Sequence, residues 1–198
     1  MACMSAKRLS KVIMFASFGT WVVYGTLSGM QHWPAAVIVG LLASIGLLSL
    51  EAVCHVKVKL LDWVLLAYFV IAAIATFAVR SAMFPMYSPI VIWGLYACVT
   101  WVSILVGAPF SLQYARESAP PEHWNSPSFL RINQVISMVW GAAFIINIGL
   151  AALALEPRYN SVLIGALAPL LLMGASVVFT VRYPKISLQR AAQQAAGG

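Results

Sequence analysis

The stretch WPAAVIVGLLASIGLLSLEAV, residues 33–53, decides the fold class of this chain. It is apolar almost throughout, and its single charged side chain, Glu51, stands near its end. A helix needs roughly 20 mostly apolar residues to cross the hydrocarbon core of a bilayer, so the stretch predicts a membrane-spanning helix. Five further runs of this kind follow or precede it: residues 12–30, 60–79, 87–106, 133–155 and 162–181.

Composition supports the same interpretation. Of the 198 residues, 62% are hydrophobic and 9% are charged, whereas soluble domains carry about 25% charged residues. We therefore expect an all-α, polytopic membrane helix bundle with six transmembrane helices. It forms a single domain over residues 1–182, followed by a short polar tail at 183–198. Nothing of domain size remains outside the bilayer, so the function must lie in the bundle, its short loops or a partner.

The basic residues set the expected orientation. With six spans, both termini share a side of the membrane with the second-to-third and fourth-to-fifth connections. Ten of the twelve basic residues fall on that side: Lys7, Arg8, Lys11, Lys57, Lys59, Arg116, Arg131, Arg182, Lys185 and Arg190. The positive-inside rule therefore places both termini in the cytoplasm. Because these residues are scattered over four short segments, we expect membrane lipids as partners and no nucleic acid.

Charged residues gather at the turn between the second and third spans. They are Glu51, His55, Lys57, Lys59 and Asp62. Two interpretations are open for this cytoplasmic charge cluster. The first is ion pairing at the membrane interface. The second is a site for a lipid head group or another anionic ligand, shared with Arg116 and Glu117.

Several chemical functions are disfavoured by what the sequence lacks. No ionisable residue is expected at mid-membrane depth, which counts against a proton-coupled carrier or an intramembrane protease. His32, His55 and His123 have no metal-binding spacing, and there is no GxSxG, phosphate-loop or GxGxxG motif. We therefore expect no metal, no cofactor and no catalytic residue in the bundle.

Polar and aromatic residues of the fifth span recur at spacings of four, three, four and three, which places them on one helical face. They are Asn133, Ser137, Trp140, Phe144 and Asn147. Asn147 lies near mid-membrane, where an unpaired amide is costly. It is expected either to bond another helix or to line a polar cavity. Candidate partners on other spans are Tyr24, Tyr68, Tyr96, Thr100 and Ser176.

A polar interruption, GAPFSLQYARESAPPEHWNSPSFLRIN at residues 107–133, separates the fourth and fifth spans. Phe110 and Tyr114 are one helical turn apart, which predicts a short amphipathic helix over 110–117 on the cytoplasmic surface. The interruption is the expected contact site for a protein partner or a lipid head group. Its predicted contact residues are Phe110, Tyr114, Arg116, Glu117, Trp124 and Phe129.

Proline and serine pairs predict helix starts. Pro34, Pro89 and Pro127 each suit the first turn of a span, with Ser88 and Ser126 as N-caps of the last two. The tail ending AAQQAAGG has too little apolar content to pack. It is expected to be a short surface helix that frays, or to be disordered.

The entry to the fifth span resembles the C-terminal half of the bacterial intracellular septation protein A family, over roughly residues 106–150. A proline followed six residues later by asparagine, with aromatics along the next span, corresponds here to Pro127, Asn133, Trp140 and Phe144. Ile136 stands where that family has a tryptophan, and the connection is longer. The resemblance implies a bacterial inner (cytoplasmic) membrane protein with a cell-envelope or septation role, contacts with division proteins and no catalytic residues.

Three functions stay open. The first is a non-enzymatic inner-membrane protein that acts through protein or lipid contacts at its cytoplasmic face. The second is a channel or facilitator for a small neutral or amphipathic solute, along the face that carries Asn133 and Asn147. The third is a membrane enzyme acting on lipid through Glu117, Glu122 and His123. Gly25 and Gly29 form a GxxxG pair that packs either inside the bundle or in a homodimer.

Overall fold

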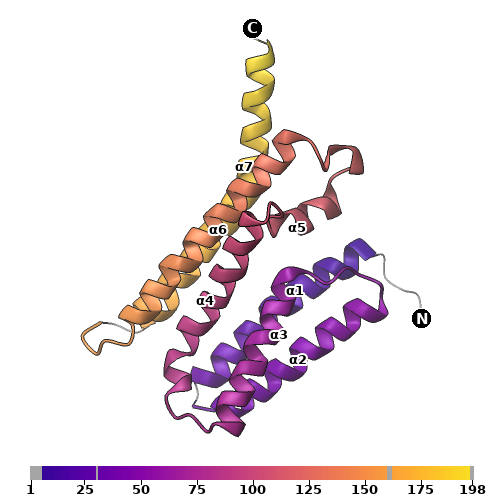
Figure 1. Ribbon diagram of the computed structural model, residues 1–198. Helices are drawn as coiled ribbons and strands as arrows, with labels where there is room; N and C mark the ends of the chain where they lie inside the picture. The colour runs from indigo at the N-terminus through magenta and orange to yellow at the C-terminus, as the bar shows by residue number, and fades with distance from the viewer. Residues whose placement is uncertain (1–5, 30, 160–161, 197–198) are drawn as a thin grey trace. The chain divides into compact units, whose positions relative to one another are not determined.

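The computed structural model describes residues 6–29, 31–159 and 162–196, and over these residues every element is a helix (Figure 1). Five described helices are long and apolar enough to cross a membrane: Trp33–Val53, Leu60–Ala78, Phe84–Leu105, Pro127–Leu153 and Leu163–Ser187. The predicted all-α fold is confirmed for the described residues, and the five apolar helices are compatible with a multi-pass membrane protein. The first predicted span is a helix too, but it is not among these five, so the count of six stays a prediction.

The elements follow one another in a simple order. Their bounds are α1 (Ala6–Gly29), α2 (Trp33–Val53), α3 (Leu60–Ala73), η1 (Ile74–Ala78), α4 (Phe84–Leu105), α5 (Ser111–Ser118), η2 (Pro121–His123), α6 (Pro127–Leu153), η3 (Leu163–Leu167) and α7 (Ala168–Ala196). The elements η1 and η3 are π-helical turns that continue into their neighbours, and η2 is a 3₁₀ turn.

The chain divides into two compact units, Met1–Ile92 and Trp93–Gly198. The division falls within α4, whose first residues belong to the first unit. In the first unit α1, α2 and α3 lie side by side (Figure 1). At Gly40 of α2 a Cβ atom would lie 2.0 Å from Cε1 of Phe69 on α3, so only glycine permits this approach.

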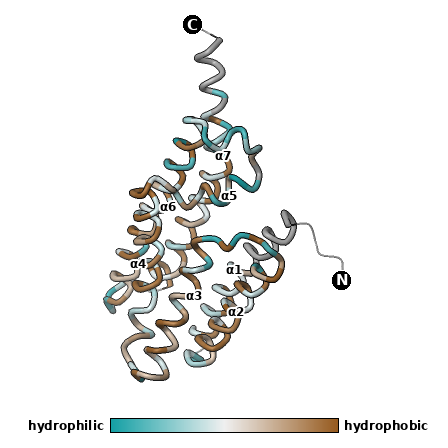
Figure 2. The backbone as a smooth tube through the Cα atoms, turned by 45° about the vertical axis from the view of Figure 1, so that its right-hand side comes forward, coloured by the Kyte–Doolittle hydropathy of each residue, from teal (hydrophilic) through white to brown (hydrophobic). Residues whose placement is uncertain are grey.

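The second unit contains the rest of α4 together with α5, α6 and α7, and α6 and α7 lie side by side (Figure 1). At Gly141 of α6 a Cβ atom would lie 2.9 Å from Nε1 of Trp101 on α4. This glycine therefore lets α4 approach α6 closely. Hydrophilic residues concentrate in the connection around α5, whereas the long helices are mainly apolar (Figure 2).

The end of α4 is fixed by backbone chemistry. Gly107 has a φ of 73°, a left-handed conformation that glycine adopts without strain. The N–H of Ala108 bonds the carbonyl of Ser103 at 3.0 Å, and the N–H of Gly107 bonds that of Ile104 at 3.0 Å. This pair of bonds is a Schellman motif, which satisfies carbonyls at the helix end. The chain therefore leaves α4 sharply and enters α5.

Two predictions about the start of α4, the N-cap Ser88 and the first-turn Pro89, are wrong. Of the two alternatives predicted for the tail, the helix is found. Ser88 and Pro89 do not start α4, because the helix already begins at Phe84, whose N–H bonds Oγ of Ser81 at 3.2 Å. Pro89 lies inside the helix. The described part of the tail is helical, because α7 continues past Pro184 to Ala196.

Candidate functional site

The connection between α4 and α6 begins with a tether to α4. Oγ of Ser103 accepts the N–H of Phe110 at 3.1 Å and donates to the carbonyl of Thr100 at 2.7 Å. Both bonds are buried. The first residue of the connection beyond its proline is therefore held against the end of α4 by a single hydroxyl group.

A second tether joins the connection to α6. Oγ of Ser111 donates to the backbone carbonyl of Asn133 at 2.8 Å and lies 3.1 Å from its Oδ1. Oγ of Ser137 donates to Oγ of Ser111 at 3.0 Å, and Nδ2 of Asn133 donates to the carbonyl of Phe129 at 2.9 Å. Buried polar groups that are mutually satisfied in this way hold one conformation. The start of α5 is thus fixed to α6 as well.

Phe110 is placed inside this arrangement rather than on its surface. Its side chain is 4% exposed, and its ring makes edge contacts with Tyr114 at 6.4 Å and with Trp140 at 6.5 Å between centroids. Phe110 therefore anchors the connection, and its role in an outside contact is indirect. The predicted helix over 110–117 is found as α5 at Ser111–Ser118.

The other predicted contact residues lie at or near the surface. Arg116 and Glu117 are exposed, while Tyr114, Trp124 and Phe129 are half-buried. The guanidinium carbon of Arg116 lies 5.5 Å from the ring centroid of Trp124, a distance at which a cation is attracted by the ring face. Nε1 of Trp124 donates to the carbonyl of Ala119 at 3.0 Å. The connection thus presents an ordered aromatic and arginine surface.

The start of α6 completes the connection. Oγ of Ser126 accepts the N–H of Phe129 at 3.3 Å, and Pro127 occupies the first turn, so the predicted N-cap is confirmed. Glu122 and His123 are exposed in the η2 turn. Among the described residues no three histidine, cysteine or acidic side chains are grouped so that they could hold a metal ion.

The cytoplasmic charge cluster predicted from sequence lies in the first unit. Glu51 is fully buried at the end of α2, and Asp62 is buried in the first turn of α3. The carboxylate of Asp62 accepts a bond from Oγ of Ser17 on α1 at 3.2 Å. It also interacts with Glu51 and with the charge of buried Lys59.

His55 takes no part in that buried group. It is exposed, and its φ of 52° marks the left-handed residue that ends α2. The structure therefore brings together Glu51, Lys59 and Asp62 with a serine from α1, and leaves His55 on the turn. The charge of Lys59 partly offsets that of Asp62, which lowers the cost of burying the two.

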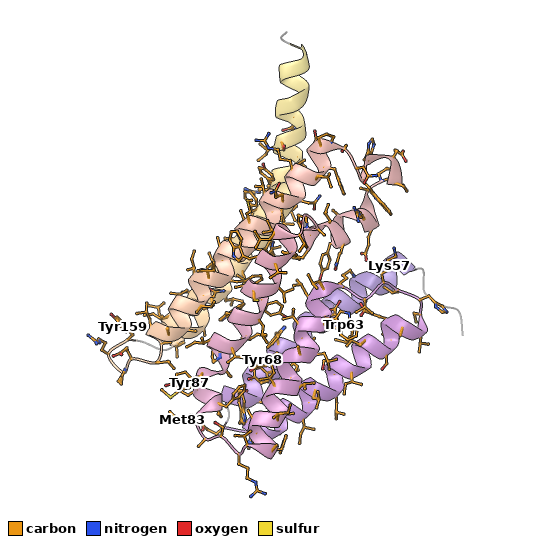
Figure 3. All side chains as sticks on the ribbon, in the orientation of Figure 1. Lys57, Trp63, Tyr68, Met83, Tyr87 and Tyr159 are labelled. Carbon is orange, nitrogen blue, oxygen red and sulfur yellow. The ribbon has the colours of Figure 1, made fainter. Side chains whose placement is uncertain are left out.

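A second buried group in the first unit consists of hydroxyl groups and rings. Tyr68 of α3, labelled in Figure 3, is fully buried and its hydroxyl bonds that of Tyr24 on α1. The hydroxyl of Tyr24 also lies 3.3 Å from Oγ of Ser88. Trp21 stacks on Phe69 at 5.5 Å. These contacts join α1, α3 and the beginning of α4.

The residues on the polar face of α6 bond or pack against different elements. Asn133 and Ser137 belong to the tether described above, and Nε1 of Trp140 donates to Oγ1 of Thr180 on α7 at 2.9 Å. Phe144 is buried and stacks on Tyr96 at 5.3 Å and on Trp93 at 6.0 Å. The predicted face therefore packs against α5, α7 and α4 in turn.

Asn147, the last residue of that face, differs from the others. Its side chain is 0% exposed, and neither Nδ2 nor Oδ1 has a hydrogen-bond partner among the described residues. Burying an amide without a partner costs roughly 2–7 kcal/mol, depending on the reference state. The hydroxyl of Thr100 and the indole N–H of Trp101 on α4 are likewise buried and unpaired in the described structure.

None of the partners predicted for Asn147 from sequence bonds its amide. Tyr24 and Tyr68 bond each other, and Ser176 donates to the carbonyl of Leu172 at 2.9 Å. Sequence reasoning also missed Ser111 and Ser17. A serine carries no periodic signal of its own, and Ser111 could have been found only as the polar residue between apolar Phe110 and Leu112 at a helix start.

Comparison with known proteins gives no match: the chain matches no protein-family model, and neither a curated protein nor a solved structure is significantly similar to it. The likeness to the septation protein A family therefore depends on Pro127, Asn133, Trp140 and Phe144, and stays a prediction from sequence.

Proposed function

We propose that this chain is a non-enzymatic integral membrane protein that acts through protein or lipid contacts made by the connection between α4 and α6. The residues assigned to the contact are Tyr114, Arg116, Glu117 and Trp124. Phe110 supports them through its ring contact with Tyr114, and Phe129 lies half-buried at the start of α6. The likeness to the septation protein A family favours a bacterial inner membrane and a cell-envelope role.

The proposal includes a topology. In it α1 is a sixth span, and both termini lie in the cytoplasm together with the connection. Its support is the charge asymmetry: ten basic residues on the proposed cytoplasmic side against Arg80 and Arg158 on the other. On that side the connection meets the anionic lipid surface, which attracts arginine and lysine.

The observation that carries the proposal is the ordering of the connection. A linker that only joined two spans would need no buried hydroxyl network, yet Ser103, Ser111 and Ser137 hold its start at both neighbouring helices. Ordering a surface before binding lowers the entropy lost when a partner docks. Arg116 above Trp124 supplies a positive charge and a ring, both of which are enriched where proteins meet partners.

The decisive experiment is site-specific photocrosslinking in native membranes. In one variant a photoreactive amino acid replaces exposed Glu122 beside the contact residues. In the control variant the same amino acid replaces Tyr159 in the connection between α6 and α7, labelled in Figure 3. We expect a discrete adduct from position 122 and none, or a weaker one, from position 159. The mass of the adduct distinguishes a protein from a lipid.

A pair of tryptophan variants provides the control. Trp124→Ala should abolish the adduct, while Trp63→Ala should leave it unchanged, because Trp63 is 55% exposed on α3 in the first unit. Equal labelling from positions 122 and 159, or an adduct indifferent to Trp124→Ala, would show that the connection is not a contact site.

A further inference from the structure

The unpaired amide of Asn147 is the starting observation, and it does not depend on the contact function proposed above. The side chain is fully buried in the second unit, with one donor group and one acceptor atom both unused by the described residues. The other amides and hydroxyls of the same face, Asn133 and Ser137, are satisfied. A molecule that enters this position can therefore gain two hydrogen bonds.

The direction of approach follows from helical geometry. Asn147 is seven residues after Trp140, which puts the two on the same side of α6. Nε1 of Trp140 bonds Thr180 of α7 at 2.9 Å, so this side of α6 faces α7. Helix α7 therefore lies beside this side of α6 at Trp140, two turns from Asn147.

The span Leu163–Ser187, formed by η3 and most of α7, is the least buried of the five described candidate spans. In its membrane-length window 11% of the residues are buried, against 39% in α6. Helix α7 is preceded by the π-helical turn η3 and has Pro169, which lacks an N–H, as its second residue. Most side chains of this span therefore face away from the protein interior, while its inner side packs on α6.

The surroundings of Asn147 define the chemical class of the ligand. One turn before it, Phe144 stacks on Tyr96 and Trp93, so the amide lies beside aromatic rings. The charged groups named above lie at helix ends and connections, and an ion would stay unneutralised here. A neutral molecule with one donor, one acceptor and a small apolar part suits both the amide and the rings.

We propose that Asn147 is the polar anchor of a binding site for a small uncharged solute that carries both a hydrogen-bond donor and an acceptor, such as a primary amide. Its Nδ2–H donates to the solute carbonyl, and its Oδ1 accepts the solute N–H. The rings of Phe144, Tyr96 and Trp93 contact the apolar part.

The test uses the full chain in detergent micelles and acetamide as the probe. Saturation-transfer NMR reports contact between protein protons and the acetamide methyl group, with empty micelles subtracted. We expect transfer with the wild-type protein and with Gln134→Leu, which removes an exposed amide from the same helix. With Asn147→Leu the affinity should fall by at least about fivefold, as expected for the loss of two hydrogen bonds of modest net strength.

A change on the ligand side keeps the test independent of any folding defect in the variant. Acetone accepts a hydrogen bond but cannot donate one, so wild-type protein should bind it more weakly than acetamide. Equal transfer to acetamide in wild type and Asn147→Leu, or equal binding of acetone and acetamide, would overturn the assignment. Absence of transfer from folded wild-type protein would overturn it as well, and a water contact at the Asn147 amide would then identify water as the occupant.

Discussion

Two asparagines on one helix, Asn133 and Asn147, show how different the two halves of α6 are. Both are buried, and both belong to the same polar face. Asn133 lies where the connection folds back, and its amide oxygen and nitrogen are used by Ser111 and by the carbonyl of Phe129. Asn147 lies in the C-terminal half of α6 and has no partner among the described residues. The same residue type therefore stabilises one half of the helix and lowers the stability of the other.

The difference comes from the neighbouring elements and not from α6 itself. Around Asn133 the neighbours are hydroxyl groups of a connection, which can rotate to donate or accept. At Asn147 no described group bonds the amide, and one turn earlier the ring of Phe144 packs on Tyr96 and Trp93. Whether a buried polar residue stabilises a span therefore depends on the groups that face it on neighbouring elements.

The largest expected effect comes from a substitution in the half of α6 whose buried polar groups are hydrogen-bonded. Asn133→Leu leaves Ser111 with fewer acceptors and removes the bond to Phe129. We expect the free energy of unfolding to fall by about 2–3 kcal/mol, because buried partners lose their hydrogen bonds. Denaturant titration in mixed micelles, followed by circular dichroism, measures it.

The neighbouring exposed amide is the control for that change. Gln134→Leu should stay within about 0.5 kcal/mol of wild type, as is usual for surface positions. If Asn133→Leu and Gln134→Leu behaved alike, the tether between α5 and α6 would contribute no stability, and the ordered connection would lose its explanation.

An intermediate effect is expected between the two asparagines, at Gly141. Gly141→Ala would place Cβ 2.9 Å from Nε1 of Trp101 and 3.3 Å from Cγ2 of Thr100, so α4 must move away from α6. We expect a loss of about 1–2 kcal/mol in unfolding free energy, within the range for overpacked interiors. The same titration measures the change.

Gly149→Ala is the matched control, because no heavy atom lies within 4 Å of its added Cβ. It should gain roughly 0.5–1 kcal/mol from helix propensity alone. A loss at Gly149 as large as at Gly141 would mean that the close approach of α4 to α6 is not what makes Gly141 necessary.

The sequence predicts the long helices well, because length and apolar content determine which segments can cross a membrane. It predicts the caps unevenly. Ser126 caps α6 as expected, whereas Ser88 lies inside α4 because that helix already begins at Phe84, whose N–H bonds Oγ of Ser81.

The bonding of the candidate site could not be predicted in the same way. The periodicity of α6 identifies the polar face but not what faces it. Ser111 is 22 residues from Asn133, on a connection whose folding back leaves no periodic signal. Ser17 reaches Asp62 across 45 residues for the same reason. Contacts between elements depend on packing, which a single helix pattern does not encode.

The smallest effect on stability is expected at Asn147, and it is the sharpest test of the contrast between the asparagines. Asn147→Leu removes a buried amide that no described residue bonds and keeps a similar volume. The free energy of unfolding should stay within about 1 kcal/mol of wild type or rise, because no partner is left unsatisfied. If it fell by as much as in Asn133→Leu, Asn147 would have a partner in the folded protein and the two halves of α6 would be alike. Added acetamide should then separate the proteins: at ten times the wild-type Kd it stabilises the wild type by about 1.4 kcal/mol and Asn147→Leu by no more than about 0.7 kcal/mol.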